Sequence, residues 1–499
     1  MMFFDFRKIS IVIFLVQLFI ILFLVLSNDY YLEVFGIHTS DGPSYINYPW
    51  GSLNEILGSH RNFGYPLFLK IIYLIFGTYD HVPIIQISFY FLSVLILYFV
   101  FFHYLKDFKL SALIFCSFLL WHIPLFKYFP QILTETNCAS LLNLCFALSI
   151  IAFRKDKLIW YMYLLIISFL LFQTRTAFVF VSFLLPFWIL LLCLIEKVDK
   201  CHLFKIFKKF ACVCILPIVF YVILRFLLVG HFGIVSLNGI LLSGHASTFY
   251  ADTDNIKFEG ELSNLHELII DRKKKLDPPC NTRFISNVEK YPVTTHNECY
   301  GKYVMMNWLA AIEIIDGDKP FDDYRIYQAW DHVPTLSEFF SRYTVNHDNL
   351  LMAYSLPIIA VHKNDYRTWM ISALSNVPVI LNSLSYKLKN KSMINYFNKW
   401  GIIGLIICLS AILGLISFLF KTTIGLKECL FFVVVSFSFF IFSLSPVLFI
   451  NKLIVRFFEL HSLYFFPGIF ILFLYIFQNI FKIMFFKFKF FKFEFLRMK

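Results

Sequence analysis

The feature that most restricts the fold of this chain is a series of apolar runs, each close to the length needed to cross a bilayer. A helix needs about 20 mostly apolar residues to span a hydrocarbon core of ~30 Å. Runs of roughly this length lie near 9–27, 83–104, 109–126, 136–153, 158–173, 176–195, 209–229, 400–420, 427–449 and 459–482. Hydrophobic residues make up 59% of the chain and charged residues 15%, whereas a soluble domain is about half apolar and a quarter charged. We therefore expect an all-α polytopic membrane protein with about 10 transmembrane helices.

Basic residues are concentrated in the connectors at every second junction between these runs. Cytoplasmic connectors of membrane proteins carry an excess of lysine and arginine, so we place these connectors and both termini in the cytoplasm. The residues concerned are Arg7, Lys8, Lys106, Lys109, Arg154, Lys155, Lys157, Lys197, Lys200, Lys205, Lys208, Lys209, Lys421, Lys427 and those of the terminal run 482–499. The net charge of +12 then reflects topology rather than a nucleic-acid partner.

This topology divides the chain into four parts and defines its external loops. The parts are an N-terminal transmembrane catalytic module at 1–229, an extracytoplasmic loop domain at 230–399, C-terminal transmembrane helices at 400–482 and a basic cytoplasmic tail at 483–499. The external loops are 28–82, 127–135, 174–175, 230–399 and 449–458. The eleven cysteines include one pair, Cys280 and Cys299, that shares the large polar loop. These two are candidates for a disulfide if the loop faces an oxidising compartment.

The first external loop carries an acid and a base beside a short apolar segment. Asp41 lies in the turn-forming run 39–43, Tyr45 follows it, and His60 and Arg61 precede the sequence GYPLFLKIIYLIF. The apolar part of that sequence, 67–76, has about ten residues and is too short to cross the bilayer core. We expect it to lie along the membrane or to pack against other segments. A lipid-borne substrate could then reach the acid and the base together.

Other external loops add one carboxylate and several cations to the same side of the membrane. Glu135 stands at the start of a span, Arg175 lies in a hairpin between two spans, and Lys452 and Arg456 precede the last span. Each has a simpler interpretation. Asp41 can serve its turn, Glu135 can complement a helix dipole, and the cations can contact lipid headgroups. Their shared location favours a joint role.

The chemistry that such groups suit is transfer of a sugar from a lipid phosphate. Negative charge grows on the phosphate as it leaves, and fixed guanidinium or ammonium groups stabilise that charge. The attacking hydroxyl needs a carboxylate that accepts its proton or orients it.

The same segments resemble the C-type (GT-C) membrane glycosyltransferases, which include protein O-mannosyltransferases, the aminoarabinose transferases of lipid A and related lipopolysaccharide glycosyltransferases. The resemblance covers the first ~200 residues best. It rests on Asp41 with Tyr45, Arg61 with Gly64-Tyr65-Pro66, the stretch 130–135 with Glu135, and Arg175 after the fifth span. A weaker similarity lies at 456–467. The chain differs from the family in the Gly-Pro after Asp41, in His60 before Arg61, and in the length and position of the loop 230–399.

The resemblance implies roles for these residues. Asp41 would be the catalytic base and Glu135 a second acid near the site. Substrate binding would fall to Arg61, Tyr45, Tyr65, His60, Arg175, Lys452 and Arg456. Some family members bind a divalent metal beside the acids, so Asp41 and Glu135 would be its ligands if one is present.

We therefore predict a glycosyltransferase that moves a hexose or pentose, with inversion, from a polyprenyl-phosphate donor. The acceptor would be an extracytoplasmic glycolipid, lipopolysaccharide or surface polysaccharide. The expected location is a bacterial inner (plasma) membrane, with the active site on the extracytoplasmic side. Three alternatives stay open: an oligosaccharide polymerase or ligase, which would depend more on external arginines and histidines, a transporter or flippase, and a structural or assembly protein, since each proposed site residue also has a simpler interpretation. A transporter is expected to carry ionisable groups at mid-depth within its spans.

Overall fold

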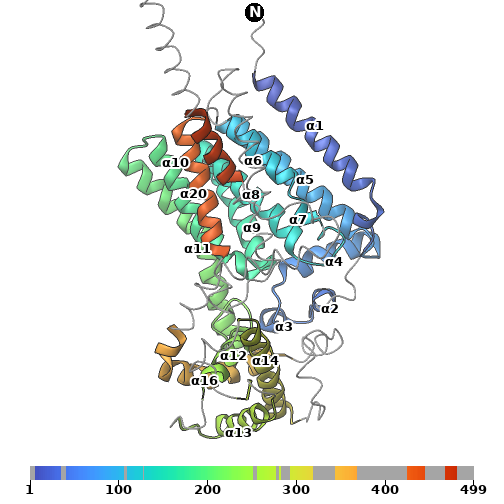
Figure 1. The fold of residues 1–499 in the computed structure, drawn as a ribbon, viewed down its shortest axis with the longest axis vertical. Helices are drawn as coiled ribbons and strands as arrows, with labels where there is room; N and C mark the ends of the chain where they lie inside the picture. Colours follow the sequence, from blue (N-terminus) through green and yellow to red (C-terminus); the bar gives the residue numbers. More distant parts are fainter. Residues whose placement is uncertain are drawn as a thin grey trace, which may run out of the picture.

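The computed structural model describes residues 6–34, 41–105, 109–126, 128–250, 256–276, 280–281, 293–317, 343–367, 424–443 and 467–479. Within these ranges the regular structure is entirely helical. The elements form two bodies, an upper bundle of apolar helices and a lower body of helices from residues 238–361 (Figure 1). The all-α class expected from the apolar runs is confirmed for the described residues.

The bundle contains five helices that are long and apolar enough to cross a membrane. They are α1 (Phe6–Leu26), α5 (Val82–Tyr104), α8 (Glu135–Lys155), α10 (Val179–Ile195, preceded by a 3-10 turn Thr176–Phe178) and α11 (Lys200–Val229). Shorter apolar helices accompany them: α6 (Lys109–Leu120), α9 (Leu158–Thr174) and Pro467–Asn479. The helix α20 (Leu426–Ser443) packs on α10 and α6.

The expected span at 109–126 is divided into two helices. The first, α6, ends at Leu120, and a four-residue helix, α7 (Ile123–Phe126), follows. Pro124 explains the division, because proline lacks the backbone N–H that would bond the carbonyl of Leu120 four residues earlier. The expected span at 400–420 lies outside the described residues, and those at 427–449 and 459–482 are described only in part.

The helix α8 lies at the centre of the bundle. It packs against α5 on one side and α9 on another, and most of its residues are buried. Small residues such as Ala139, Ser140 and Ala147 let the neighbouring backbones approach closely. Within the same interface the Asn143 amide donates to the Ser93 hydroxyl, with 3.0 Å between the heavy atoms. The position of α8 thus determines where its first residue, Glu135, stands.

Three short helices lie at the lower end of the bundle. They are α2 (Gly42–Ile46), α3 (Leu53–Gly58) and α4 (Gly64–Phe76). The helix α4 buries Leu69 and Ile72 but leaves Leu74 and Ile75 exposed, so it carries an apolar face that the described protein does not cover. It packs against α2 and α9, and this contact brings the first loop to the ends of the long helices.

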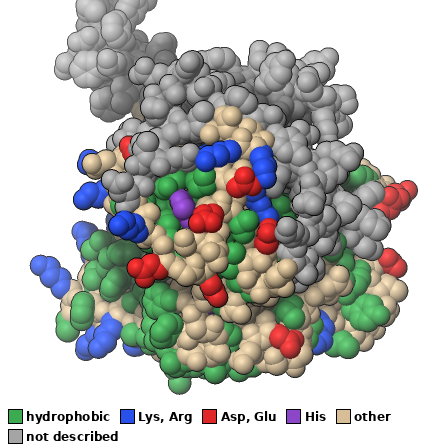
Figure 2. All heavy atoms as spheres, turned by 90° about the horizontal axis from the view of Figure 1, so that it is seen from below, with side chains coloured by type: hydrophobic (Ala, Val, Ile, Leu, Met, Phe, Trp, Pro, Cys, Tyr) green, Lys and Arg blue, Asp and Glu red, His purple; other side chains and the backbone are tan. Residues whose placement is uncertain are grey.

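The lower body consists of α12 (Asn238–Phe249), α13 (Glu261–Lys274), α14 (Val293–Asp316) and α16 (Val345–Val361). It has its own core, which includes Ile269, Tyr303, Trp308 and Leu351. Seen from below, its surface mixes acidic and basic side chains with apolar ones (Figure 2). The 30-residue helix α11 runs from the bundle to this body (Figure 1).

Cys280 and Cys299 form a disulfide in the lower body. The bond closes a loop with a sequence separation of 19 residues. Closing a loop of this size removes conformational entropy from the unfolded chain and stabilises the fold by about 3 kcal/mol. We expect the double variant Cys280→Ser/Cys299→Ser to lose about this much stability, measured as a lower unfolding temperature in detergent. The same substitution at the exposed Cys201 provides the control, and equal unfolding temperatures for both variants would contradict the prediction.

Candidate functional site

The structure joins Asp41 and Arg61 directly, although twenty residues separate them in the chain. The Arg61 Nη2 donates to Asp41 Oδ1 over 2.7 Å, and both side chains are largely buried. Asp41 stands immediately before α2, and Arg61 lies between α3 and α4. The Arg61 Nε donates to the Ser44 hydroxyl over 3.0 Å, and the guanidinium lies 4.8 Å from the centre of the Tyr45 ring. The first loop is therefore organised around one arginine.

A second ion pair joins Glu135 to Arg175 at the lower ends of α8 and α9. The Arg175 Nη1 lies 2.8 Å from Glu135 Oε1 and also donates to Thr134 Oγ1 over 3.1 Å. Glu135 begins α8, and Arg175 follows the last residue of α9 in an extended conformation. Because α8 and α9 are antiparallel neighbours, the start of one meets the end of the other.

The first loop reaches this second pair through a close contact at Gly64. A Cβ atom at this position would stand 2.6 Å from the Gln173 carbonyl carbon, so only glycine allows the start of α4 to approach the end of α9 this closely. The Asn62 amide reinforces the contact by donating to the Phe172 carbonyl over 2.9 Å. The glycine of the Gly-Tyr-Pro motif is thus required for packing.

Tyr45 lies between the two ion pairs. Its ring meets the Tyr65 ring edge to face, with 5.1 Å between the ring centres. Burial raises the pKa of Tyr45. The guanidinium groups of Arg61 and Arg175 lower this pKa, and the carboxylates of Asp41 and Glu135 raise it. The phenol therefore stays protonated and offers a hydroxyl group between two arginines and two carboxylates.

His60 is buried beside Arg61 and is held in its neutral form. Burial lowers the pKa of His60 well below its ordinary value of 6.5, and the adjacent Arg61 charge lowers it further. As the pH falls below 6.5, His60 of the unfolded chain therefore binds a proton. In the folded protein the same residue stays unprotonated over this range.

Because of His60, we expect the free energy of unfolding to decrease below pH 6.5, by up to about 1.4 kcal/mol per pH unit. The variant His60→Gln removes the titrating group and should reduce this slope. The measurement is unfolding by denaturant in detergent between pH 7.5 and 5, with the exposed His202→Gln as control. An unchanged slope in His60→Gln would refute the assignment.

A cavity of about 730 Å³ opens next to the first ion pair. Its walls come from the first loop, the end of α11 and the start of α16. Ser44, which accepts a hydrogen bond from Arg61, and His60 both line it. Arg61 thus adjoins the cavity through Ser44, whereas Asp41, Arg61 and Glu135 do not themselves line it.

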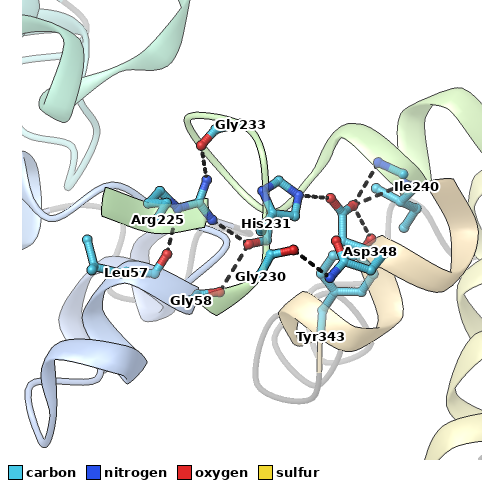
Figure 3. A network of polar contacts seen from close by, with 12 residues as sticks. Leu57, Gly58, Arg225, Gly230, His231, Gly233, Ile240, Tyr343 and Asp348 are labelled. Carbon is cyan, nitrogen blue, oxygen red and sulfur yellow. Dashed lines mark hydrogen bonds and ion pairs between the residues drawn. The ribbon is translucent and has the colours of Figure 1, made fainter. Parts of the chain in front are cut away.

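Beside the cavity lies a polar network that the sequence interpretation did not identify (Figure 3). Arg225 is fully buried and donates to the Leu57 carbonyl, the Gly233 carbonyl and the Ser236 hydroxyl over 2.5–2.7 Å. Ser236 in turn donates to the Gly58 carbonyl over 3.1 Å. An arginine within an apolar run is unusual enough to have signalled this role.

The second half of the network is centred on Asp348, in the first turn of α16. Its carboxylate lies 2.7 Å from His231 Nε2 and accepts from the Tyr343 hydroxyl and from the backbone N–H of Gly239. All of these groups are buried. The network ties the first loop, the end of α11 and the lower body into one unit (Figure 3).

Two further expectations concern cations and metals. Lys452 and Arg456 lie outside the described residues. Among the residues that the structure describes, no three histidine, cysteine, aspartate or glutamate side chains group in a way that could hold a metal ion. Asp41 and Glu135 each direct an oxygen at an arginine.

The site and fold define an all-helical protein with helices suited to a membrane and a buried cluster of paired charges at one end of its bundle. Comparison with protein families, curated proteins and solved structures finds no match to this chain.

Proposed function

We propose that this chain is a polytopic membrane glycosyltransferase that uses a polyprenyl-phosphate-linked sugar. The observation that supports this function most directly is the pairing of Asp41 with Arg61 and of Glu135 with Arg175 around Tyr45. Two guanidinium groups can hold a lipid phosphate, and two carboxylates beside them can serve an attacking hydroxyl. The resemblance to C-type glycosyltransferases, which rests on the same residues, points the same way.

The proposed orientation places this cluster on the extracytoplasmic side of a bacterial inner membrane, with ten spans and both termini inside. The opposite end of the bundle carries the basic connectors, where Arg154 pairs with Glu196 and Lys209 with Asp156. The positive-inside rule assigns that end to the cytoplasm. The disulfide in the lower body suits an oxidising compartment. In this orientation α4 would lie along the membrane, with its exposed apolar face toward lipid.

The proposed reaction is a single displacement at the anomeric carbon of the donor sugar. The acceptor oxygen forms the new glycosidic bond as the bond between the anomeric carbon and the phosphate oxygen breaks. The polyprenyl phosphate leaves with the electron pair, and the hydroxyl proton passes to Asp41. Attack from the face opposite the leaving group inverts the anomeric centre. Arg61 and Arg175 stabilise the charge that grows on the phosphate.

The ion pair between Asp41 and Arg61 implies an order of substrate binding, with the donor before the acceptor. In the free protein Arg61 neutralises Asp41 and keeps its carboxylate occupied. A donor phosphate that binds Arg61 competes for the same guanidinium donors. Binding of the donor would therefore release Asp41 to accept a hydrogen bond from the acceptor hydroxyl, so the base becomes available only when the donor is in place.

The decisive experiment uses purified protein in detergent micelles, where no compartments exist. The donor is the polyprenyl-phosphate sugar fraction of the native cells, and the acceptor is the envelope glycan fraction of a strain that lacks this gene. Formation of a new glycosidic bond and release of polyprenyl phosphate, both detected by mass spectrometry, are expected. A transporter or flippase would leave both substrates unchanged, and a polymerase or ligase would transfer a preassembled oligosaccharide. Either result would contradict the proposal.

A further inference from the structure

The cavity beside Arg61 is lined by groups that suit a sugar better than a phosphate. Its side chains include amides, hydroxyls, prolines and aliphatic groups, and Glu55 is its single carboxylate among the lining residues. Lysine and arginine are missing from this lining set. His60, which also lines it, is held neutral by burial. Among these lining residues a phosphate would meet a negative charge and no cation, whereas a neutral polyhydroxyl compound would meet donors and acceptors.

Three asparagines from separate segments converge on this cavity. Asn47 follows α2, Asn54 lies in α3 and Asn346 lies in the first turn of α16, and all three are exposed. Within the described part of the chain, their side-chain amides make no hydrogen bond to the protein. Each amide offers both a donor and an acceptor to a ligand, as sugar hydroxyl groups require.

The walls that carry these asparagines are held in place by the buried network. Arg225 holds the carbonyl of Leu57, and Ser236 holds that of Gly58, at the end of the helix that carries Asn54. On the other wall, Asp348 binds the hydroxyl of Tyr343, which itself lines the cavity three residues before Asn346. A site whose walls are fixed in advance loses less entropy on binding.

From these observations we propose that the cavity binds the saccharide of the acceptor, with Asn47, Asn54 and Asn346 as its specificity-determining residues. This inference rests on the proposed glycosyltransferase function and assigns a place to its second substrate. The donor enters with its lipid chain in the bilayer, so its phosphate reaches Arg61 from the membrane side. The cavity extends from Ser44 to residues 343–346 at the lower body. An acceptor saccharide lying in it would present a hydroxyl group near Asp41.

The test compares substrate saturation curves of the double variant Asn54→Ala/Asn346→Ala with those of the wild type. The loss of two hydrogen bonds to neutral hydroxyls should raise the half-saturating concentration of the acceptor about tenfold. The acceptor used is the envelope glycan fraction of the deletion strain. The half-saturating concentration of the donor and the rate at saturating acceptor should stay close to wild type. The matched control is Asn264→Ala, an exposed asparagine on α13 outside the cavity.

The other outcomes distinguish a wrong assignment of the cavity from a wrong proposed function. An unchanged acceptor curve, in a protein whose transfer is abolished by Asp41→Asn, overturns the cavity assignment and leaves the function standing. A shift in the donor curve instead of the acceptor curve gives the cavity to the donor sugar and also overturns the inference. If wild-type protein forms no glycosidic bond, the proposed function itself fails and takes the inference with it. If Asp41→Asn transfers at the wild-type rate, Asp41 is not the base, and the assignment of the cavity beside it to the acceptor is overturned.

Discussion

Replacing Asp41 by asparagine is expected to lower the rate of sugar transfer by about a hundredfold to ten-thousandfold, the range that loss of a general base produces. Asparagine has nearly the shape of aspartate but cannot accept the proton of the attacking hydroxyl. The amide oxygen can still accept a hydrogen bond from Arg61, so the first loop should keep its shape. The defect should therefore fall on the catalytic rate rather than on folding, measured as transfer by purified protein in detergent.

Two further variants distinguish the role of Asp41 as base from the role of Arg61 in phosphate binding. Arg61→Gln removes the proposed phosphate contact, so its main effect should be a higher half-saturating concentration of the donor. The control Asp80→Asn replaces an exposed acid in the same external loop and should transfer at the wild-type rate. An Asp41→Asn protein that is folded and fully active would refute the mechanism, because the proposed proton transfer requires the Asp41 carboxylate.

The variant Arg225→Met is expected to produce the largest loss of stability, about 3–5 kcal/mol, because it removes the donor of three acceptors and each buried acceptor left unsatisfied costs about 1–3 kcal/mol. The guanidinium satisfies two backbone carbonyls and one hydroxyl, of which the Leu57 carbonyl and the Ser236 hydroxyl are buried and the Gly233 carbonyl is partly buried. Methionine fills part of the volume but donates no hydrogen bond, so these acceptors would be left without their donor. The measurement is the unfolding temperature in detergent, together with the rate of proteolysis in the lower body.

Two other variants qualify this prediction. Arg225→Lys retains the charge, but an ammonium group lacks the planar geometry that reaches three separated acceptors, so it should recover only part of the stability. Arg367→Met, at an exposed position after α16, is the matched control and should unfold at the wild-type temperature. Wild-type stability of Arg225→Met would show that the network contributes little to joining the two bodies.

The sequence predicted the helical class and several boundaries of the long helices closely. The apolar run at 83–104 corresponds to α5, and that at 136–153 lies within α8. These predictions succeed because the requirement for about 20 apolar residues in a span is local in the chain. The run at 209–229 corresponds to only part of α11, which begins at Lys200. Periodicity and composition do not reveal that a helix continues beyond its apolar segment.

The candidate site was predictable as a set of residues but not as an arrangement. Asp41 and Arg61 share one loop, so the sequence predicts that they meet, and the structure adds the direct ion pair between them. The Glu135–Arg175 pair arises because α8 and α9 pack as antiparallel neighbours. Arg225 was overlooked, although its place in an apolar run indicated a need for buried partners.

The amino-acid sequence by itself determined that this chain forms helices suited to a membrane, because hydrophobicity and helix length act over neighbouring residues. It also determined which polar side chains lie at the ends of those helices. Only the tertiary structure decided which of them meet. Ion pairs, the cavity and the Arg225–Asp348 network depend on contacts between residues that lie far apart in the chain, such as Ser236 with Gly58, which are 178 positions apart. Such contacts are set by how helices pack, and packing is a property of the whole chain.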